Sequence, residues 1–216
     1  MATFKVIGIA PSPYTQRVLV VLNEKGADYF LQEIDRMGNA QKKPEHLLLQ
    51  PFGQIPVIQD GDFTLFESRA IVRYIADKYE GQGPSLYGKT LEERALVEQW
   101  LAVEVEEFDS PTGAAVFQLV FGPKYVGIPT DEAIVSSSLE KLAKVLDVYE
   151  AHLSKSKFLA GDFLSIADLV HLPLLFFLVT VGNRGEVVTS RKHVKAWYET
   201  MSSLPSWYKV LSLLSP

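Results

Sequence analysis

A stretch rich in glycine and proline divides the chain into two parts with different hydrophobic patterns. Residues 80–89 contain three glycines and one proline, which is typical of a linker. Before this stretch, short apolar runs alternate with helix-like segments. After it, apolar residues recur at intervals of three and four, the spacing of one helical face. The sequence therefore predicts an α/β domain over residues 1–80, a linker over 81–89 and an all-helical domain over 90–216.

The first domain reads as strand, helix and strand, followed by two strands and a helix. The predicted elements are strands over 4–9, 28–35, 55–58 and 63–66 and helices over 13–25 and 67–79. A strand-helix-strand unit of this length implies a right-handed parallel crossover. Asp60-Gly61-Asp62 is a tight hairpin signal, so the last two strands are expected to be antiparallel.

Capping residues mark the helices predicted for the second domain. Thr90 and Glu93 form a capping box, and Thr130 is expected to cap a second long helix. Pro111 should bend or break the first of these helices, and Gly122-Pro123 should end the next segment. Two further helices are expected over residues 190–203 and 205–214.

A second capping box and a histidine are assigned to the structure of this domain rather than to chemistry. Ser165 and Asp168 should cap the helical segment that follows them. His171 lies within an apolar helix, where we expect a hydrogen-bonded core group.

Composition excludes several classes of function. The 216 residues include no cysteine, which rules out disulfides, thiolate metal sites and a cysteine nucleophile. The net charge of −5 and the lack of a long basic run argue against nucleic acid as a partner. The four histidines show no metal-ligand spacing, so no metal is expected. The longest apolar run, 172–181, is far shorter than a membrane span, and residues 1–25 lack a signal-peptide layout, so we expect a cytoplasmic protein.

Ser12 stands where the first helix begins. Pro13 fits the first helical position, where a missing N–H costs nothing, and Ser12 fits the N-cap before it. Free backbone N–H groups and the positive end of the helix dipole make such a point suitable for an anion. A serine hydroxyl there can donate a hydrogen bond to a bound thiolate. The alternative is that Ser12 only caps the helix.

Six stretches of the chain carry a resemblance to a known family. They lie at residues 12–18 (SPYTQRV), 41–44 (QKKP), 50–56 (QPFGQIP), 65–71 (LFESRAI), 144–150 (KVLDVYE) and 158–169 (FLAGDFLSIADL). With a proline that opens the third strand, the first domain looks like a thioredoxin-type domain. Together with the helical domain, these stretches resemble the soluble glutathione transferases, and in particular the phi class of plants.

The resemblance implies a glutathione site on the first domain. Its residues would be Ser12 for the sulfur, Gln41 and Lys42 for the glycyl carboxylate, Ile55 for the cysteinyl backbone, and Gln54, Glu67 and Ser68 for the γ-glutamyl end. It also implies a cis bond before Pro56. The family often has histidine where this chain has Gln41, and an uncharged amide there is expected to change the affinity for the glycyl end.

Each of these residues also has a simpler interpretation. Lys42 and its neighbour Lys43 could be a solvated pair, and Pro56 could start an edge strand. Glu67 and Ser68 could serve only as residues that favour a helix start. We favour the glutathione site because the positions that would bind three parts of one tripeptide are all suitably filled.

The acceptor site is expected to be apolar and to lie between the domains. The candidates are Pro13, Met37, Phe117 and Phe121. The alternative is that Phe117 and Phe121 pack in the helical core, since a spacing of four shows only that they share a helical face.

The function implied is that of a glutathione S-transferase, which activates glutathione as a thiolate for attack on hydrophobic electrophiles and could also reduce organic hydroperoxides. Glutathione would be a co-substrate, with no further cofactor, and the family forms homodimers. The alternative function is a non-catalytic carrier (a ligandin) of flavonoids or other planar apolar molecules. Turnover of an electrophile with glutathione would separate the two.

Overall fold

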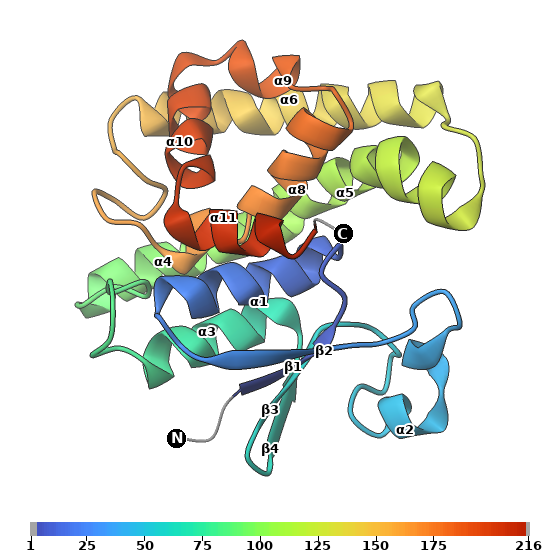
Figure 1. Ribbon diagram of the computed structural model, residues 1–216. Coiled ribbons are helices and arrows are strands. Elements are labelled where there is room, and N and C mark those ends of the chain that lie inside the picture. The colour runs from blue at the N-terminus through green and yellow to red at the C-terminus, as the bar shows by residue number, and fades with distance from the viewer. Residues whose placement is uncertain (1–3, 215–216) are drawn as a thin grey trace. The chain divides into compact units, whose positions relative to one another are not determined.

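The computed structural model describes residues 4–214, which fall into two compact units (Figure 1). The first unit comprises residues 4–87 and 204–214, and the second comprises residues 88–203. The sequence predicts a first domain that ends at residue 80 and a second domain over residues 90–216. The main difference concerns the last helix, α11 (Pro205–Ser212), which packs against α1 (Pro13–Glu24) of the first unit.

The contacts of α11 show why it belongs to the first unit. Trp207 is buried, and the side-chain amide of Asn23 donates a hydrogen bond to the carbonyl oxygen of Ser206 (3.1 Å). The hydroxyl of Ser206 donates to the carboxylate of Glu24. The sequence of an amphipathic helix shows which of its faces is apolar, but not which surface that face covers. The sequence therefore predicts this helix correctly but cannot assign it to a domain.

The first unit contains the mixed α/β order that the sequence predicts. Its elements are β1 (Phe4–Gly8), α1 (Pro13–Glu24), β2 (Tyr29–Glu33), η1 (Ala40–Lys42), α2 (Pro44–Leu47), β3 (Val57–Asp60), β4 (Phe63–Phe66), α3 (Ser68–Lys78) and α11. The four strands form one sheet in the order β2-β1-β3-β4. Helices α1 and α3 contact each other and lie on the same face of this sheet (Figure 1).

The strand register explains how the ends of three segments reach one edge of the sheet. Strand β1 is parallel to β2, as the predicted crossover requires, and antiparallel to β3. Ile7 lies opposite Val57, which in turn lies opposite Phe66 in β4. The end of β1, the start of β3 and the end of β4 therefore lie in one row across the sheet. The segments after β1, before β3 and after β4 therefore all lie at this edge of the sheet.

The buried faces of α1 and the central strands form the core of the first unit. Val18 and Leu22 of α1 and Val6 and Ile58 of the sheet are fully buried. Burial of an aliphatic side chain of this size contributes about 1.5–3 kcal/mol before the entropy of ordering is subtracted. This core fixes the start of α1 relative to the sheet, and with it the position of Ser12.

The second unit is helical throughout its described elements. These are α4 (Leu91–Val103), η2 (Glu104–Asp109), α5 (Ser110–Val116), η3 (Phe117–Val126), α6 (Glu132–Leu153), α7 (Ile166–Leu169), α8 (Leu172–Phe176), η4 (Phe177–Val181), α9 (Glu186–Thr189) and α10 (Lys192–Ser202).

The capping box at the start of α4 is confirmed, because the N–H of Glu93 donates to Oγ1 of Thr90 (3.1 Å) and the carboxylate of Glu93 accepts from the N–H of Thr90 (3.4 Å). None of the helices within residues 4–214 is both long and apolar enough to cross a membrane.

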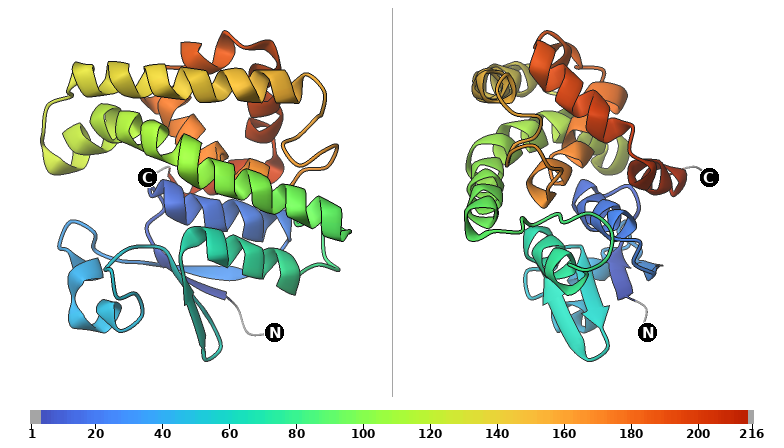
Figure 2. Two further views of the ribbon diagram at one scale, coloured as in Figure 1. Left: turned by 180° about the vertical axis from the view of Figure 1, so that it is seen from behind. Right: turned by 90° about the vertical axis from the view of Figure 1, so that its left-hand side faces the viewer.

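Pro111 was expected to bend or break the first helix of this unit, and the break is wrong. Residues 91–126 form one continuous helical run, which is seen as a single coiled ribbon in Figure 2. The segment before Pro111, η2, is a π-helix, and Pro111 stands at the first turn of α5. A wider π turn changes which carbonyls the following N–H groups reach, so the run continues past a residue that has no N–H to donate. The π-helix η3 likewise passes through Pro123 and ends at Gly127, whose φ of 76° closes the run.

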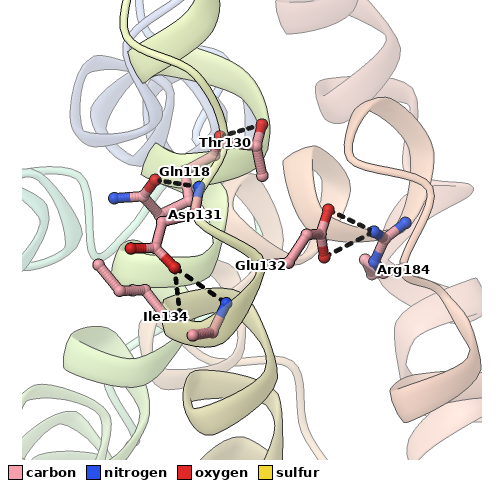
Figure 3. Close-up of polar contacts among 7 residues, drawn as sticks. Gln118, Thr130, Asp131, Glu132, Ile134 and Arg184 are labelled. Atoms are coloured by element: carbon pink, nitrogen blue, oxygen red, sulfur yellow. Dashed lines mark hydrogen bonds and ion pairs between the residues drawn. The ribbon is translucent and has the colours of Figure 1, made fainter.

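The expected cap of α6 is off by one residue. Oδ1 of Asp131 accepts hydrogen bonds from the N–H groups of Ala133 (2.9 Å) and Ile134 (3.2 Å), so Asp131 is the N-cap (Figure 3). The hydroxyl of Thr130 donates instead to the carbonyl oxygen of Gln118 (2.9 Å). Thr130 and Asp131 are both good caps by residue type, so the sequence alone does not distinguish them.

Buried polar side chains of the second unit are joined in a hydrogen-bonded network, as expected for His171 and Asp168. Nε2 of His171 lies 3.0 Å from the hydroxyl of Tyr149, and its Nδ1 lies 2.7 Å from the carbonyl oxygen of Ala167. The carboxylate of Asp168 accepts from the N–H and hydroxyl of Ser165 and from Nε1 of Trp197. Burial raises the pKa of Asp168. Both residues are therefore structural groups of this core.

Candidate functional site

The start of α1 holds Ser12 as predicted. Ser12 is the N-cap, with extended backbone angles, and Pro13 is the first helical residue. The hydroxyl oxygen of Ser12 accepts a hydrogen bond from the N–H of Thr15 (3.4 Å), which leaves the hydroxyl proton for an acceptor beyond the helix. Ser12 is 8% exposed, so this proton lies in a poorly hydrated place. Capping the helix and donating to an anion are therefore compatible roles of one hydroxyl.

The start of α3 has a strained residue at the position predicted for the γ-glutamyl end. Glu67 has φ 70° and ψ 107°, a region that a residue with a side chain rarely adopts. Such a conformation costs about 1–3 kcal/mol and is common at functional sites. Ser68, the first residue of α3, is buried, whereas Glu67 is exposed. An exposed carboxylate thus stands beside a helix N-terminus, an arrangement that can bind an ammonium group and a carboxylate together.

The segment between Gln54 and Pro56 precedes an interior strand. The Ile55–Pro56 bond is cis, as predicted. Strand β3 begins at Val57, two residues later than the sequence predicts, and lies between β1 and β4. The alternative that Pro56 starts an edge strand is therefore wrong. Ile55 lies outside the paired part of the strand, where its main chain can bind an extended peptide.

Gln54 is held by residues that the sequence analysis did not single out. Its N–H donates to Oε1 of Gln50 (3.1 Å), and its side-chain oxygen accepts from Nε2 of the same glutamine (3.4 Å). Nε2 of His46 lies 2.8 Å from the carbonyl oxygen of Gln54. Both partners are buried, and the only signal in the sequence is their spacing of four in a helical turn.

Gln41 and Lys42 belong to η1 and differ in exposure. Gln41 is 2% exposed, and its Nε2 donates to Oδ1 of Asn39 (3.2 Å). Its Oε1 has no hydrogen-bond partner among residues 4–214. Lys42 is exposed, but its Nζ donates to the carbonyl oxygen of Phe52 (2.8 Å), so it is not simply a solvated charge. Lys42 therefore presents a fixed cation, whereas the side chain of Gln41 points away from solvent.

Gly53 fixes the backbone between these groups. Its φ is 63°, and a methyl group at this position would lie 2.6 Å from Cδ of Lys42 and 2.8 Å from the carbonyl oxygen of Gln41. Only glycine fits both the conformation and the space. In the sequence, this glycine stands out only as a member of the stretch 50–56 that carries the family resemblance.

The register of the sheet brings three of the predicted segments to one edge. Ser12 follows β1, Ile55 precedes β3 and Glu67 follows β4, and the row Ile7–Val57–Phe66 places these three ends side by side. A hydroxyl donor, a stretch of main chain that precedes the paired part of β3, and a helix N-terminus with a carboxylate thus meet at one edge. This set suits an extended, thiol-containing peptide with charged ends.

The four acceptor candidates belong to different units. Pro13 is buried in the first unit, and Met37 in the same unit is 66% exposed. Phe117 is 40% exposed, whereas Phe121 packs against Phe177 and Tyr125 with ring centroids 5.0 and 6.0 Å apart. Core packing therefore describes Phe121 better than Phe117. No group of three or more histidine and acidic side chains within residues 4–214 is placed to hold a metal ion.

Comparison with known proteins places both units in one family. The model of the glutathione S-transferase N-terminal domain matches residues 2–77, and that of the C-terminal domain matches residues 110–205. The chain is 50% identical over 196 residues to glutathione S-transferase F10 of Arabidopsis thaliana, covering 91% of each chain. It is 45% identical over 214 residues to glutathione S-transferase 3 of Zea mays, covering 99% of this chain and 96% of that one.

Solved structures agree with this assignment over almost the whole chain. Glutathione transferase F7 from Populus trichocarpa matches with a TM-score of 0.94 and 43% identity, covering 99% of this chain and 100% of that one. Glutathione S-transferase I from mais, in complex with an atrazine glutathione conjugate, matches with a TM-score of 0.90 and 42% identity, covering 100% and 99%.

Proposed function

The chain belongs to the phi class of plant glutathione S-transferases, and we propose that its Ser12 hydroxyl holds the sulfur of glutathione as a thiolate for attack on hydrophobic electrophiles. The observation that carries this proposal is the edge of the sheet at which Ser12, Ile55 and Glu67 meet. One tripeptide with a thiol between two charged ends matches the groups found there.

The proposed binding of glutathione assigns each end to a group of suitable chemistry. The carboxylate of Glu67 pairs with the γ-glutamyl ammonium, and Ser68 at the start of α3 binds the γ-glutamyl carboxylate. The main chain of Ile55 pairs with the cysteinyl backbone. Lys42, held by the carbonyl oxygen of Phe52, binds the glycyl carboxylate.

Gln41 has a different place in this proposal. Its side chain is buried against Asn39, so it supports η1 and reaches the glycyl end only if its amide turns outward. Gln54 contributes through a side chain that Gln50 already orients.

The thiolate requires a moderate amount of free energy. A free thiol has a pKa of about 8.5, so only a few per cent is ionised at neutral pH. Lowering this pKa by about two units requires about 2.7 kcal/mol of preferential stabilisation of the anion. A hydrogen bond to a charged group contributes about 1.5–3 kcal/mol, and a helix N-terminus adds about 0.3–1 kcal/mol. Ser12 and α1 together therefore suffice.

The chemical step needs no further group from the protein. The thiol proton passes to solvent when the thiolate forms. The sulfur then attacks an electrophilic carbon, a carbon–sulfur bond forms, and a leaving group such as chloride departs with the bonding electrons. A neighbour of known structure holds a glutathione conjugate of atrazine, which supports an apolar electrophile as the acceptor. The same thiolate would also reduce an organic hydroperoxide: it attacks a peroxide oxygen, the O–O bond breaks, and the alcohol leaves after it takes up a proton. A second glutathione then displaces water from the resulting sulfenic acid and gives glutathione disulfide.

The proposal is tested by Ser12→Ala, with 1-chloro-2,4-dinitrobenzene as the electrophile. We expect kcat/KM to fall at least about tenfold, because the anion loses a charge-assisted hydrogen bond. Binding of glutathione, measured by calorimetry, should change much less, because the charged ends keep their partners. Near-normal turnover in this variant would show that the Ser12 hydroxyl does not stabilise the thiolate of glutathione. Tight binding of a flavonoid without turnover in the wild-type protein would favour a carrier.

The setting of this activity is also part of the proposal. We place the protein in the cytoplasm as a homodimer that detoxifies electrophiles. Sedimentation of the purified protein tests the dimer directly.

A further inference from the structure

The last turn of α2 and the residues after it face Gln54 with two side chains. The N–H of Gln50 donates to the carbonyl oxygen of His46 (2.9 Å), so these residues are one helical turn apart. Both side chains are buried, His46 at 5% and Gln50 at 2% exposure. A buried imidazole needs hydrogen-bond partners within the protein, and a helix of four residues supplies few of them.

Gln54 is the shared partner of the two side chains. Oε1 of Gln50 accepts from the N–H of Gln54, and Nε2 of Gln50 donates to the side-chain oxygen of Gln54. Nε2 of His46 lies 2.8 Å from the carbonyl oxygen of Gln54. A carbonyl oxygen can only accept, so Nε2 of His46 carries the proton and donates it. Three polar groups of one residue are therefore fixed from one short segment.

The carbonyl of Gln54 and the N–H of Ile55 belong to the same peptide unit. A peptide unit is planar, and its C=O and N–H point in opposite directions. A donor that fixes the Gln54 carbonyl therefore also fixes the direction of the Ile55 N–H. That N–H is part of the main chain that, on the function proposed above, pairs with the cysteinyl backbone of glutathione.

We infer that His46 is a positioning residue for glutathione, because its Nε2–H sets the Gln54–Ile55 peptide plane to which the cysteinyl residue of the substrate binds. The inference rests on the proposed glutathione site. His46 acts through the main chain and does not itself touch the substrate. Its effect is specific to glutathione and does not extend to the electrophile.

A positioning role for His46 and a packing role require different properties of the side chain. Packing requires only the size of the side chain, whereas orientation of the peptide requires a donor at the place of Nε2. A glutamine can place its Nε2–H near the position of the imidazole Nε2–H, but a leucine of similar volume has no donor. His46→Gln and His46→Leu therefore form a matched pair, and Glu45→Gln, at an exposed position of the same helix, is the control.

The experiment measures steady-state kinetics of the full-length variants with glutathione and 1-chloro-2,4-dinitrobenzene varied separately. We expect His46→Leu to raise the KM for glutathione about fivefold to tenfold, the effect of one lost hydrogen bond. His46→Gln should restore most of this loss, and Glu45→Gln should match the wild type. The KM for the electrophile should stay within about twofold in all three variants. Thermal unfolding is recorded in parallel to show that each variant is folded.

Two results would overturn the inference. One is an unchanged KM for glutathione in a folded His46→Leu variant. The other is an equal loss in His46→Gln and His46→Leu that affects both substrates and follows the fall in Tm, since this would indicate packing alone. Failure of the proposed function is distinguishable, because the wild-type protein would then show no conjugation and no saturable binding of glutathione.

Discussion

Replacement of Gly53 by alanine is expected to destabilise the first unit, by an amount that follows from its backbone angle and its neighbours. An alanine at this position keeps φ near 63°, which costs a residue with a side chain about 1–2 kcal/mol. Its methyl group would also lie 2.8 Å from the carbonyl oxygen of Gln41 and 2.6 Å from Cδ of Lys42. The lysine can move, but the carbonyl is backbone, and overpacking of this kind costs typically about 1–3 kcal/mol. We therefore expect Gly53→Ala to lower the free energy of unfolding by about 2–5 kcal/mol.

The chain contains a matched control for this substitution. Gly61, in the β3–β4 hairpin, has a φ of 60°, but a methyl group there would meet no heavy atom within 4 Å among residues 4–214. Gly61→Ala should therefore show only the conformational cost, about 1–2 kcal/mol. The difference between the two variants isolates the clash with η1.

The assay combines urea-induced unfolding with the KM for glutathione. Gly53→Ala should raise this KM because the displaced carbonyl and side chain belong to Gln41 and Lys42, whereas Gly61→Ala should leave it unchanged. Equal destabilisation by the two substitutions, or an unchanged KM in Gly53→Ala, would refute the role assigned to Gly53.

Two further predictions concern buried or paired carboxylates. Partial burial disfavours the charge of Asp60, but hydrogen bonds from Lys78 and Tyr74 outweigh it and hold its pKa below the ordinary value. The stability from this group is therefore present above the unfolded-state pKa and is lost as the pH falls through the folded-state pKa. Unfolding measured between about pH 2 and 6 should depend less steeply on pH in Asp60→Asn, and an unaltered slope would contradict this. In the second unit, Asp168→Asn leaves one acceptor oxygen for the donors of Ser165, Leu159 and Trp197, and each donor left unpaired should cost about 1–3 kcal/mol in thermal unfolding. A variant as stable as the wild type would show that these contacts contribute little.

Much of the fold follows from local sequence signals because those signals act over a few residues. The N-cap at Ser12 and the capping box at Thr90 are both confirmed. Each depends on a residue type and its immediate neighbours. The parallel pairing of β1 with β2 follows from the predicted crossover, and the antiparallel pairing of β3 with β4 follows from their short hairpin turn. The pairing of β1 with β3 was not predicted, because a long connection separates β2 from β3.

The errors arise where a distant contact decides between local options. Asp131 caps α6 through its carboxylate, whereas the hydroxyl of Thr130 donates to the carbonyl oxygen of Gln118, which is distant in the sequence. The run through Pro111 continues because a π turn precedes it. The assignment of α11 depends on its contacts with Asn23 and Glu24, far away in the sequence.

The same distinction holds for the candidate site. Ser12 stands at a helix start, where the sequence alone suggests an anion, whereas Glu67 and Ser68 were assigned to the γ-glutamyl end through the family resemblance. His46 and Gln50 could not be predicted, because their role depends on facing Gln54 across a turn. The burial of Gln41 was also not foreseen, because a glutamine in a polar loop gives no sign of pairing with Asn39.

The most direct test of the account is the pKa of the glutathione thiol when it is bound to the protein. Titration of the thiolate by its ultraviolet absorbance gives this value for the wild type and for Ser12→Ala. We predict a pKa about two units below the value of about 8.5 for a free thiol in the wild type, and a return most of the way to that value in the variant. The same pKa in both proteins would contradict the claim that the Ser12 hydroxyl keeps the sulfur ionised.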